Sequence, residues 1–508
     1  MGMIGFTVGF IGFLLHNVID AIEEPILEKA LELAKEGKIG IVWCWRVGMG
    51  VILASLSSII IVYFRPSAGG SGIPELIAFL NGTSIRHIYN VRTLLAKFAS
   101  CAFAVSAGLF AGPEGPMIHI GALVGAGLSQ FKSDSMGINL AYFQRFRNPE
   151  DRRNFISAGA AAGVSSAFGA PVGGLLFSME EVSSFWSNRL TWQVFFCSMI
   201  AAFTTNIFNS AFLGFHYQLE ILNNIIIFIP TICLGILGGG LGSLFVFMNL
   251  KIVRLRDWVE TFSISSRLKK LMKIAEVVII ITLTATISTT LPLARKCQHQ
   301  KVPIKTGVSA NGKWRYTNQT YNELSSLLYT SQDHAINQLL SRGTHKQYSP
   351  EGLLYYFIPY FLLACWTSTA SLSVGLVMPM LTIGALYGRM IGELLVIWFG
   401  EHFYYGEKYS DASDYKAWMD PGAIALIGAA SFFAGVSRLT ISLTVIMIEI
   451  TNDVTMLLPI MTAIMVAKIV GDQLTHPIYH ALLEVKCIPI LDEEPVVYTQ
   501  DPNGRSVL

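Results

Sequence analysis

The chain has 508 residues, of which 52% are hydrophobic and 14% are charged. Soluble domains carry roughly 25% charged residues, so this composition excludes an ordinary soluble protein and indicates several membrane crossings. With 36 basic and 34 acidic residues the net charge is +2, which gives no support to a nucleic-acid partner. The seven cysteines form no CxxC pair, so we expect no zinc site, no disulfide framework and no bound cofactor.

Apolar stretches recur along the chain and differ widely in length. They lie at about residues 4–16, 39–64, 94–111, 155–182, 190–215, 221–253, 274–293, 352–372, 380–399, 421–450 and 455–470. Simple membrane spans need about 20 apolar residues, and glycine and proline clusters divide several of these stretches into shorter pieces. The clusters lie at 69–74, 112–116, 169–174 and 375–379. Such interruptions are typical of broken helices that meet at a midplane binding site. The sequence therefore predicts an all-α polytopic membrane protein with broken or re-entrant helices.

Two segments of the chain show weak similarity to each other. When residues 151–181 are placed on 420–450 without gaps, a Gly-Ala-Ala run aligns with an identical run, and Glu180 aligns with Glu449. Small residues are abundant in all membrane helices, so this match alone does not establish a repeat. It agrees with the two related halves from which many transporters are built.

The residues between 251 and 273 are predominantly basic, and the positive-inside rule places them in the cytosol. The next apolar stretch, 274–293, then carries the polar loop 294–350 to the luminal or extracellular side. This loop holds Asn318 in an Asn-Gln-Thr sequence, which is an acceptor for N-glycosylation, although such a sequence also occurs by chance. A second acceptor sequence begins at Asn81, and we expect it to be cytosolic and unmodified.

The first glycine-rich motif runs from Gly70 to Glu75 with the sequence GSGIPE. Glycines leave backbone amides uncovered, Pro74 suits the first turn of a helix, and Ser71 occupies the expected N-cap position. Amides and a hydroxyl that converge at a helix start can bind an anion. The commoner meaning of such a motif is an ordinary capped helix.

The second motif, GPEGP at residues 112–116, places Glu114 within an apolar segment. A carboxylate in such a segment is costly and is a candidate for a functional role. At a helix start it can occupy the place of a bound anion when ionised and can leave that place when protonated. Such a glutamate would act as a gate. The alternative is a first-turn glutamate that only stabilises its helix.

Three further features complete the pattern. The stretch GAPVGG at 169–174 leads to the adjacent acids Glu180 and Glu181, which point about 100° apart on a helix and so are expected to differ in role. The sequence GLVMP at 375–379 is another helix start with exposed amides. Tyr479 could donate a hydrogen bond to an anion, although a tyrosine near a membrane boundary is more often an interfacial anchor.

In this order, and over nearly the whole chain, these motifs resemble the CLC family of chloride channels and chloride/proton exchangers. The phrases at 116–119 (PMIH), 157–171 (SAGAAAGVSSAFGAP) and 443–449 (LTVIMIE) are similar to the endosomal and lysosomal eukaryotic branch. The resemblance implies two halves of inverted topology, at about 1–215 and 221–490. It also implies that chloride and protons are transported and that the protein is a homodimer in the lipid bilayer, and it leaves an accessory subunit open.

The same resemblance implies roles for single residues. Chloride would be bound by the hydroxyls of Ser71 and Tyr479 and by nearby backbone amides. Those amides belong to Gly72, Ile73, Leu376 and Val377. Glu114 would be the gating glutamate and Glu181 would transfer protons to the cytosol, with Glu180 structural. Passive channels of the family usually lack the internal acid, so Glu181 favours a chloride/proton antiporter of endosomal or lysosomal membranes.

Three features depart from the family pattern. Pro113 stands where a lysine or arginine usually precedes the gating acid, which removes a positive charge from the anion route. Val377 stands where phenylalanine is usual. The eukaryotic relatives continue into paired cytoplasmic CBS domains, whereas here a transmembrane domain at 1–490 is followed by a short cytoplasmic tail at 491–508. We expect a fragment, a short variant or a protein without nucleotide regulation.

Two other functions compete with antiport. A passive, voltage-gated chloride channel could use the same fold. The GxSG sequence around Ser71 also fits an intramembrane serine protease, but the apolar segments offer no convincing histidine base for it. We therefore expect a transporter rather than an enzyme.

Overall fold

The computed structural model describes residues 1–85, 87–130, 132–133, 138–139, 146–208, 227–261, 265–295, 298–299, 320–341, 347–399, 420–491, 499–500 and 506–507. The glycosylation candidate Asn318 and most of the expected tail at 491–508 lie outside these residues.

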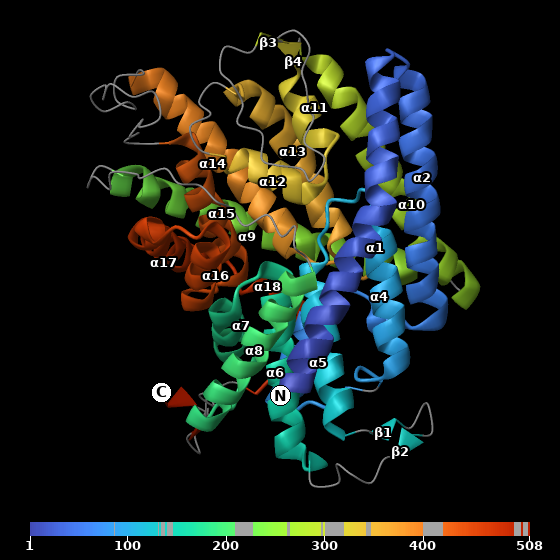
Figure 1. Cartoon of the computed structure of the whole chain (residues 1–508), viewed down its shortest axis with the longest axis vertical. Helices are drawn as coiled ribbons and strands as arrows, with labels where there is room; N and C mark the ends of the chain where they lie inside the picture. Colours follow the sequence, from blue (N-terminus) through green and yellow to red (C-terminus); the bar gives the residue numbers. More distant parts are fainter. Residues whose placement is uncertain are drawn as a thin grey trace.

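The described part of the chain is almost entirely helical (Figure 1). Its α-helices are α1 (Gly2–Lys35), α2 (Ile39–Ile59), α3 (Ile73–Asn81), α4 (Val91–Ser106), α5 (Glu114–Gln130), α6 (Pro149–Phe168), α7 (Pro171–Phe177), α8 (Asn188–Phe208), α9 (Phe228–Thr261), α10 (Ser266–Thr290), α11 (Glu323–Leu328), α12 (Gln332–Leu339), α13 (Pro350–Thr367), α14 (Val377–Phe399), α15 (Pro421–Ser437), α16 (Ile441–Thr451), α17 (Leu457–Leu474) and α18 (Ile478–Val485). The strands form three short antiparallel pairs, namely β1 (Lys132–Ser133) with β2 (Ile138–Asn139), β3 (Gln298–His299) with β4 (Thr320–Tyr321), and β5 (Thr499–Gln500) with β6 (Ser506–Val507). The predicted all-α class is confirmed.

Full membrane spans alternate with shorter helices. Seven helical segments of the described chain are long and apolar enough to cross a membrane, and they contain α1, α2, α8, α9, α10, α14 and α17. By contrast, α3 has nine residues and α7 has seven. The break between α6 and α7 lies at Gly169, whose φ of +66° ends α6, and Pro171 then begins α7. The predicted broken helices are present, and α1 extends well beyond the apolar stretch at 4–16 from which it was predicted.

Two helix pairs, α5 with α6 and α14 with α15, correspond to each other in the two halves of the chain. Both α5 and α14 begin near the centre of the molecule, and they run toward opposite ends of it (Figure 1). A Cβ atom on Gly121 would lie 2.2 Å from the carbonyl oxygen of Gly159, and a Cβ on Gly384 would lie 2.4 Å from Cα of Ala429. Each crossing therefore needs a glycine, as is common where membrane helices pack closely. The two halves of inverted topology are confirmed.

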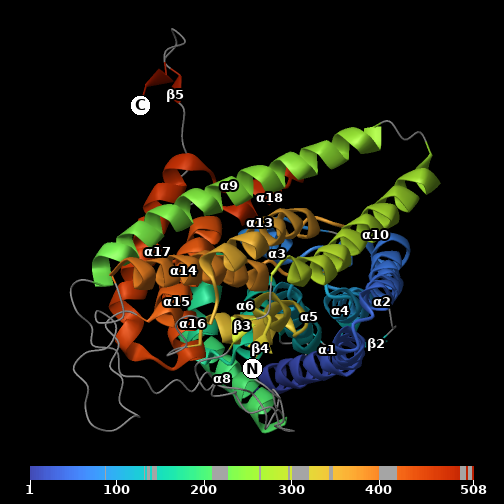
Figure 2. The same ribbon diagram turned by 90° about the horizontal axis from the view of Figure 1, so that it is seen from above.

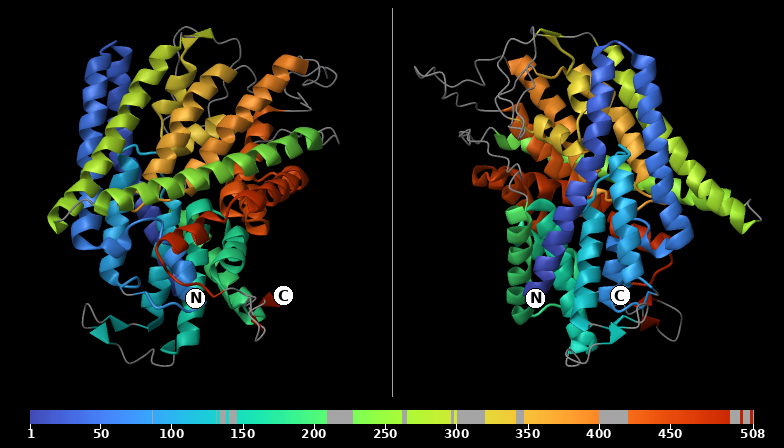
Figure 3. Two further views of the ribbon diagram at one scale, coloured as in Figure 1. Left: turned by 180° about the vertical axis from the view of Figure 1, so that it is seen from behind. Right: turned by 45° about the vertical axis from the view of Figure 1, so that its right-hand side comes forward.

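The hairpin of α9 and α10 and the strand pair of β3 and β4 lie in different parts of the molecule. Seen from above, α9 and α10 form a long hairpin along one side, and its tip stands away from the body (Figure 2). The predominantly basic residues from 251 to 273 lie in the parts of α9 and α10 next to that tip. The strands β3 and β4 lie at the opposite end of the molecule from the N-terminus (Figure 3).

The residues that follow α18 are attached to the end of α3. Asn81 Oδ1 accepts a hydrogen bond from Leu491 N at 2.7 Å, and Asn81 Nδ2 donates to Leu491 O at 3.0 Å. Thr83 Oγ1 donates to Pro489 O at 2.8 Å. The Asn81 amide is thus engaged with the chain itself.

Candidate functional site

Three glycine-rich loops meet where α3, α5 and α14 begin. The loops before α5 and α14 pair with each other, because Gly112 N donates to Gly375 O at 3.2 Å and Gly375 N donates to Gly112 O at 2.7 Å. The loop before α3 joins them through Gly70 N, which donates to Leu372 O at 2.7 Å. Motifs from three distant parts of the sequence therefore form one structure with three helix N-termini, and helix N-termini favour anions.

Close contacts explain the glycines of this structure. A Cβ atom on Gly115 would lie 3.0 Å from Cβ of Ser71, so Ser71 lies against the first turn of α5. Gly72 has a φ of +82°, and a Cβ there would lie 2.2 Å from Nδ1 of His119. Gly72 holds the N-cap position of α3, so the prediction that Ser71 would be the N-cap is wrong by one residue. Ser71 Oγ accepts a long hydrogen bond, 3.4 Å, from Ile73 N.

Glu114 is the first residue of α5, and its side chain is almost completely buried at 1% exposure. Its Oε2 atom lies 2.2 Å from the place that a Cβ on Gly112 would occupy, and Cβ of Met378 lies 2.7 Å from the same place. Oε2 has no hydrogen-bond partner among the described residues. The carboxyl group is thus folded back between the N-termini of α5 and α14, where a negative charge is favoured and one oxygen remains available to a proton.

Tyr479 is the second residue of α18 and is buried. Its burial argues against the alternative of an interfacial anchor. The phenol interacts electrostatically with Glu181, and α18 packs against α3. The contacts therefore link Ser71, Glu114 and the start of α14 directly, whereas Tyr479 and Glu181 interact only through their electrostatics. Leu376 and Val377, which the sequence also singled out, are buried directly after Gly375.

The two adjacent acids have different surroundings. Glu180 accepts hydrogen bonds from Thr440 N at 2.7 Å and from Ser442 N at 2.8 Å, at the start of α16. Glu181 Oε1 is buried and has no hydrogen-bond partner in the described part of the chain. Both acids lie in the π-helical turn Ser178–Val182 that continues α7. Glu180 is therefore fixed as a helix cap, whereas Glu181 keeps an oxygen that can accept a proton.

Glu449 on α16 aligns with Glu180 in the sequence. Just as Glu180 caps α16, Glu449 caps the start of α7. Its carboxylate accepts hydrogen bonds from Val172 N at 3.1 Å and from Gly173 N at 2.7 Å, at the start of α7. Each half of the chain thus caps a short helix of the other half with a glutamate. The two glutamates that align in the sequence therefore have the same structural task in the two halves.

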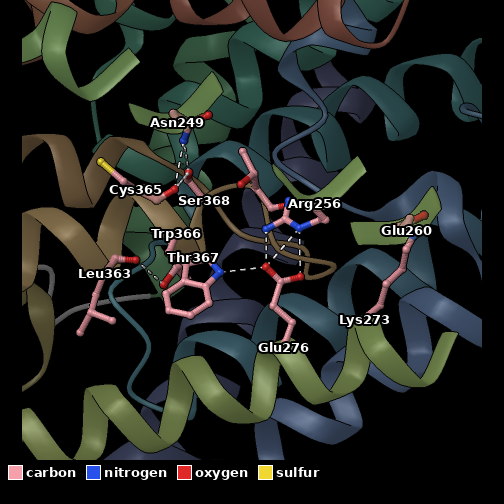
Figure 4. Close-up of polar contacts among 11 residues, drawn as sticks. Asn249, Arg256, Glu260, Lys273, Glu276, Leu363, Cys365, Trp366, Thr367 and Ser368 are labelled. Atoms are coloured by element: carbon pink, nitrogen blue, oxygen red, sulfur yellow. Dashed lines mark hydrogen bonds and ion pairs between the residues drawn. The ribbon is translucent and has the colours of Figure 1, made fainter. Parts of the chain in front are cut away.

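A polar cluster holds the loop that leads into α14 (Figure 4). Arg256 on α9 pairs with Glu276 on α10, with Nη2 2.7 Å from Oε1, and Trp366 Nε1 donates to the same Oε1 at 2.8 Å. Arg256 Nη1 also donates to Thr369 O. A charged pair with an indole donor therefore fixes the end of α13 and the residues just before Leu372 and Gly375.

Asn249 on α9 strengthens the same attachment (Figure 4). Its Nδ2 donates to Cys365 O at 3.2 Å and also to Ser368 Oγ, while Ser368 Oγ donates to Cys365 O at 2.9 Å. Asn249 is fully buried. The last turn of α13 is thus tied to α9 by side chains, which leaves the loop before α14 little freedom at its start.

A family model described as voltage gated chloride channel matches residues 50–472. The chain belongs to this family. Among relatives of this CLC chain, Chloride channel protein D of Dictyostelium discoideum is 35% identical over 96% of the chain and 55% of the relative. Chloride channel protein C of the same organism is 34% identical over 97% of the chain and 64% of the relative.

A human relative is named H(+)/Cl(-) exchange transporter 7, and it is 34% identical over 99% of this chain and 61% of its own length. The CLC chain thus spans 55 to 64% of these three relatives. A crystal structure of a eukaryotic CLC transporter matches with a TM-score of 0.70 and 23% identity, covering 96% of this chain and 73% of that one. A slow cyanobacterial Cl-/H+ antiporter matches with a TM-score of 0.70 and 21% identity, covering 96% of both chains. These structures establish the CLC fold for a multi-pass membrane protein.

Sequence reasoning missed Lys97 in this CLC chain. Lys97 lies on α4, is fully buried, and donates from Nζ to Ala68 O at 3.1 Å and to Gly70 O at 2.9 Å. It therefore holds the loop that presents Ser71 and places a positive charge behind it. The signal was present, because a lysine inside the apolar stretch at 94–111 is costly unless it has a role.

Proposed function

We propose that this chain is a chloride/proton antiporter of endosomal or lysosomal membranes. The observation that supports this most strongly is a pair of acids, Glu114 and Glu181, each with a buried carboxyl oxygen that has no hydrogen-bond partner among the described residues. Transport of chloride alone needs no second acid, whereas proton transfer needs groups that can gain and lose a proton. The human relative named H(+)/Cl(-) exchange transporter 7 supports the same pair of ions.

Chloride would bind where the N-termini of α3, α5 and α14 meet. The ligands would be the hydroxyls of Ser71 and Tyr479 together with backbone amides, from Gly72, Ile73, Leu376 and Val377. Amides at helix starts carry partial positive charge and can replace the water around an anion without forming a permanent ion pair. A site of this kind binds chloride reversibly, as a transporter requires.

Glu114 would act as the gate. When ionised, its carboxylate occupies the space between α5 and α14 and excludes chloride by charge and by volume. When protonated, it loses the attraction to the two N-termini and can move away, so that an anion takes its place. The free Oε2 atom is the group that would accept the proton.

Glu181 would carry protons between Glu114 and the cytosol. It lies in the π-helical turn after α7, next to Glu180, whose carboxylate is fixed on α16. Only Glu181 of the two acids has an oxygen left to receive a proton. Its electrostatic interaction with Tyr479 connects proton transfer with the anion site.

A homodimer would cover apolar faces that the single chain leaves open. Exposed large side chains form a stripe on α8, at Trp192, Phe196, Met199 and Phe203, and another on α17, at Leu458, Met461, Met465 and Ile469. Each stripe follows the three-to-four-residue spacing of one helix face. We infer that one of these faces contacts a second copy and that the lipid bilayer covers the other exposed apolar surface.

The orientation follows from charge. The basic residues from 251 to 273 would face the cytosol, and the loop 294–350 would face the lumen, where Asn318 could be glycosylated. We place the tail at 491–508 in the cytosol on the same ground, because it follows α18 and is attached to the end of α3 through Asn81.

Purified protein in vesicles tests the proposal. With a chloride gradient imposed, the unmutated chain should move protons against their gradient, and Glu181→Ala should carry chloride without moving protons. Glu114→Ala should carry chloride at a rate that no longer depends on pH. Glu36→Ala, which alters an exposed acid that pairs with Lys38, is the control and should keep proton coupling. Chloride flux without proton movement in the unmutated chain would favour the passive channel instead.

A further inference from the structure

A cavity of about 50 Å³ lies among α1, α2, α4, α10, α11, α12, α13 and α14. Part of its lining adjoins the proposed anion site. Phe110 lies in the loop before Glu114, Thr382 lies in the second turn of α14, and Tyr360 packs on Phe110 with ring centroids 4.2 Å apart. Tyr360 also interacts electrostatically with Glu114. We call this space the outer cavity.

The rest of the lining comes from the end of the molecule that carries β3 and β4. Leu328 of α11 and Gln332 of α12 belong to it, and Gln332 Nε2 donates to Leu109 O at 2.5 Å. Two charged side chains, Glu23 of α1 and Arg46 of α2, also line the outer cavity. Arg46 is the one cationic side chain in this lining, all of whose residues the structure describes.

Arg46 is held in place by neutral groups. Its Nη1 donates to Leu328 O at 3.2 Å, and its guanidinium lies 5.2 Å from the centroid of the Tyr329 ring. No other hydrogen bond from Arg46 is found within the described residues, so most of its N–H groups are available to the cavity. A guanidinium is more weakly hydrated than an ammonium group, so it releases its water to an anion more easily.

One acid, Glu23, acts on this cation, and three further acids act on Glu23. Glu23 interacts electrostatically with Arg46, and also with Asp20 and Glu24 on α1 and with Asp333 on α12. A chloride ion that approaches from this end of the molecule therefore meets acidic side chains, which repel it when they are ionised. Arg46 is the cation in this lining that can offset the repulsion, since Pro113 beside the gate carries no charge.

We propose that Arg46 forms an outer binding site for chloride and other small monovalent anions, from which the anion moves to the three helix N-termini. This inference rests on the proposed transport of chloride. It assigns α2 a part in anion capture and makes Glu23 an opposing group that weakens capture when it is ionised.

The test compares variants by the external chloride concentration that gives half of the maximal flux into vesicles. Arg46→Gln should raise this concentration by roughly three- to tenfold, because one charge at this range changes the local anion concentration by about that factor. Arg46→Lys should restore most of the difference. Lys38→Gln is the matched control, because Lys38 lies at the same end of the molecule, is exposed and pairs with Glu36. It should leave the value unchanged.

A second variant keeps the test independent of folding. Glu23→Gln leaves Arg46 in place and removes the charge that Glu23 carries when ionised, so it should lower the half-maximal chloride concentration in an alkaline medium. The proposal is overturned if Arg46→Gln and Glu23→Gln both match the unmutated chain, or if Arg46→Lys is impaired as much as Arg46→Gln, which would indicate a structural role only. Absence of chloride flux in the unmutated chain would instead contradict the proposed function.

Discussion

A single methyl group added at Gly121 should push α5 away from α6. The new Cβ atom would lie 2.2 Å from Gly159 O, and ordinary contacts begin at 3.4 Å, so the helices must separate by about 1.2 Å. Overpacking of this kind costs about 1–3 kcal/mol. Gly127 on the same helix is the matched control, because a Cβ there meets nothing within 4 Å, and alanine should stabilise the helix by about 0.5–1 kcal/mol.

The two variants should therefore differ by about 1.5–4 kcal/mol in unfolding free energy. Thermal unfolding in detergent, followed by tryptophan fluorescence, gives the order of stability, and chloride flux in vesicles gives the effect on the site. Since α5 begins at Glu114, Gly121→Ala should also slow transport by about tenfold, because displacements near 1 Å disturb a positioned group. Equal stability and equal flux in Gly121→Ala and Gly127→Ala would show that the contact with Gly159 does not set the position of α5.

Four further substitutions test the supports of the site. Glu449→Gln and Glu180→Gln each weaken hydrogen bonds from two backbone amides to one carboxylate. Each should lower the free energy of unfolding by about 0.5–2 kcal/mol in the same assay. Unchanged stability in both variants would show that these two caps do not stabilise the fold. Glu276→Gln removes the carboxylate charge that binds both Arg256 and Trp366, so it should lower the free energy of unfolding by about 1–3 kcal/mol. It should also lower the affinity for chloride, measured by calorimetric titration. Unchanged affinity would show that this polar cluster does not support the anion site. Lys97→Met leaves Ala68 O and Gly70 O without their hydrogen-bond donor, so it should lower the free energy of unfolding by about 3–5 kcal/mol. It should also weaken chloride binding more than Gly127→Ala does. Unchanged chloride binding in Lys97→Met would contradict a role for the buried charge.

The sequence was sufficient to locate the parts of the site. Glycine, serine and proline at 70–75, 112–116 and 375–379 carry strong local preferences, so the helix starts could be placed within a residue or two. Glu114 was recognisable because a carboxylate in an apolar segment is costly. The difference between Glu180 and Glu181 could be anticipated from helix geometry, although not which partner each would have.

The contacts between these parts could not be predicted, because they join residues far apart in the chain. Nothing local to Gly112 indicates its pairing with Gly375, and nothing near Glu180 points to the start of α16. The surroundings of the two buried or half-buried cations could not be predicted from the sequence either. Lys97 and Arg46 lie in apolar helices and signal a cost, but only the fold shows that one faces carbonyls beneath Ser71 and the other faces a cavity.

The central claim is that chloride and proton movements are coupled, and a pH gradient tests it most directly. Vesicles that contain the unmutated protein receive equal chloride on both sides, an acidic interior, and valinomycin with equal potassium to hold the membrane potential at zero. An antiporter should let protons leave and accumulate chloride inside, although chloride itself has no gradient. If chloride remains at equilibrium while the same vesicles conduct chloride down an imposed gradient, the coupling is contradicted.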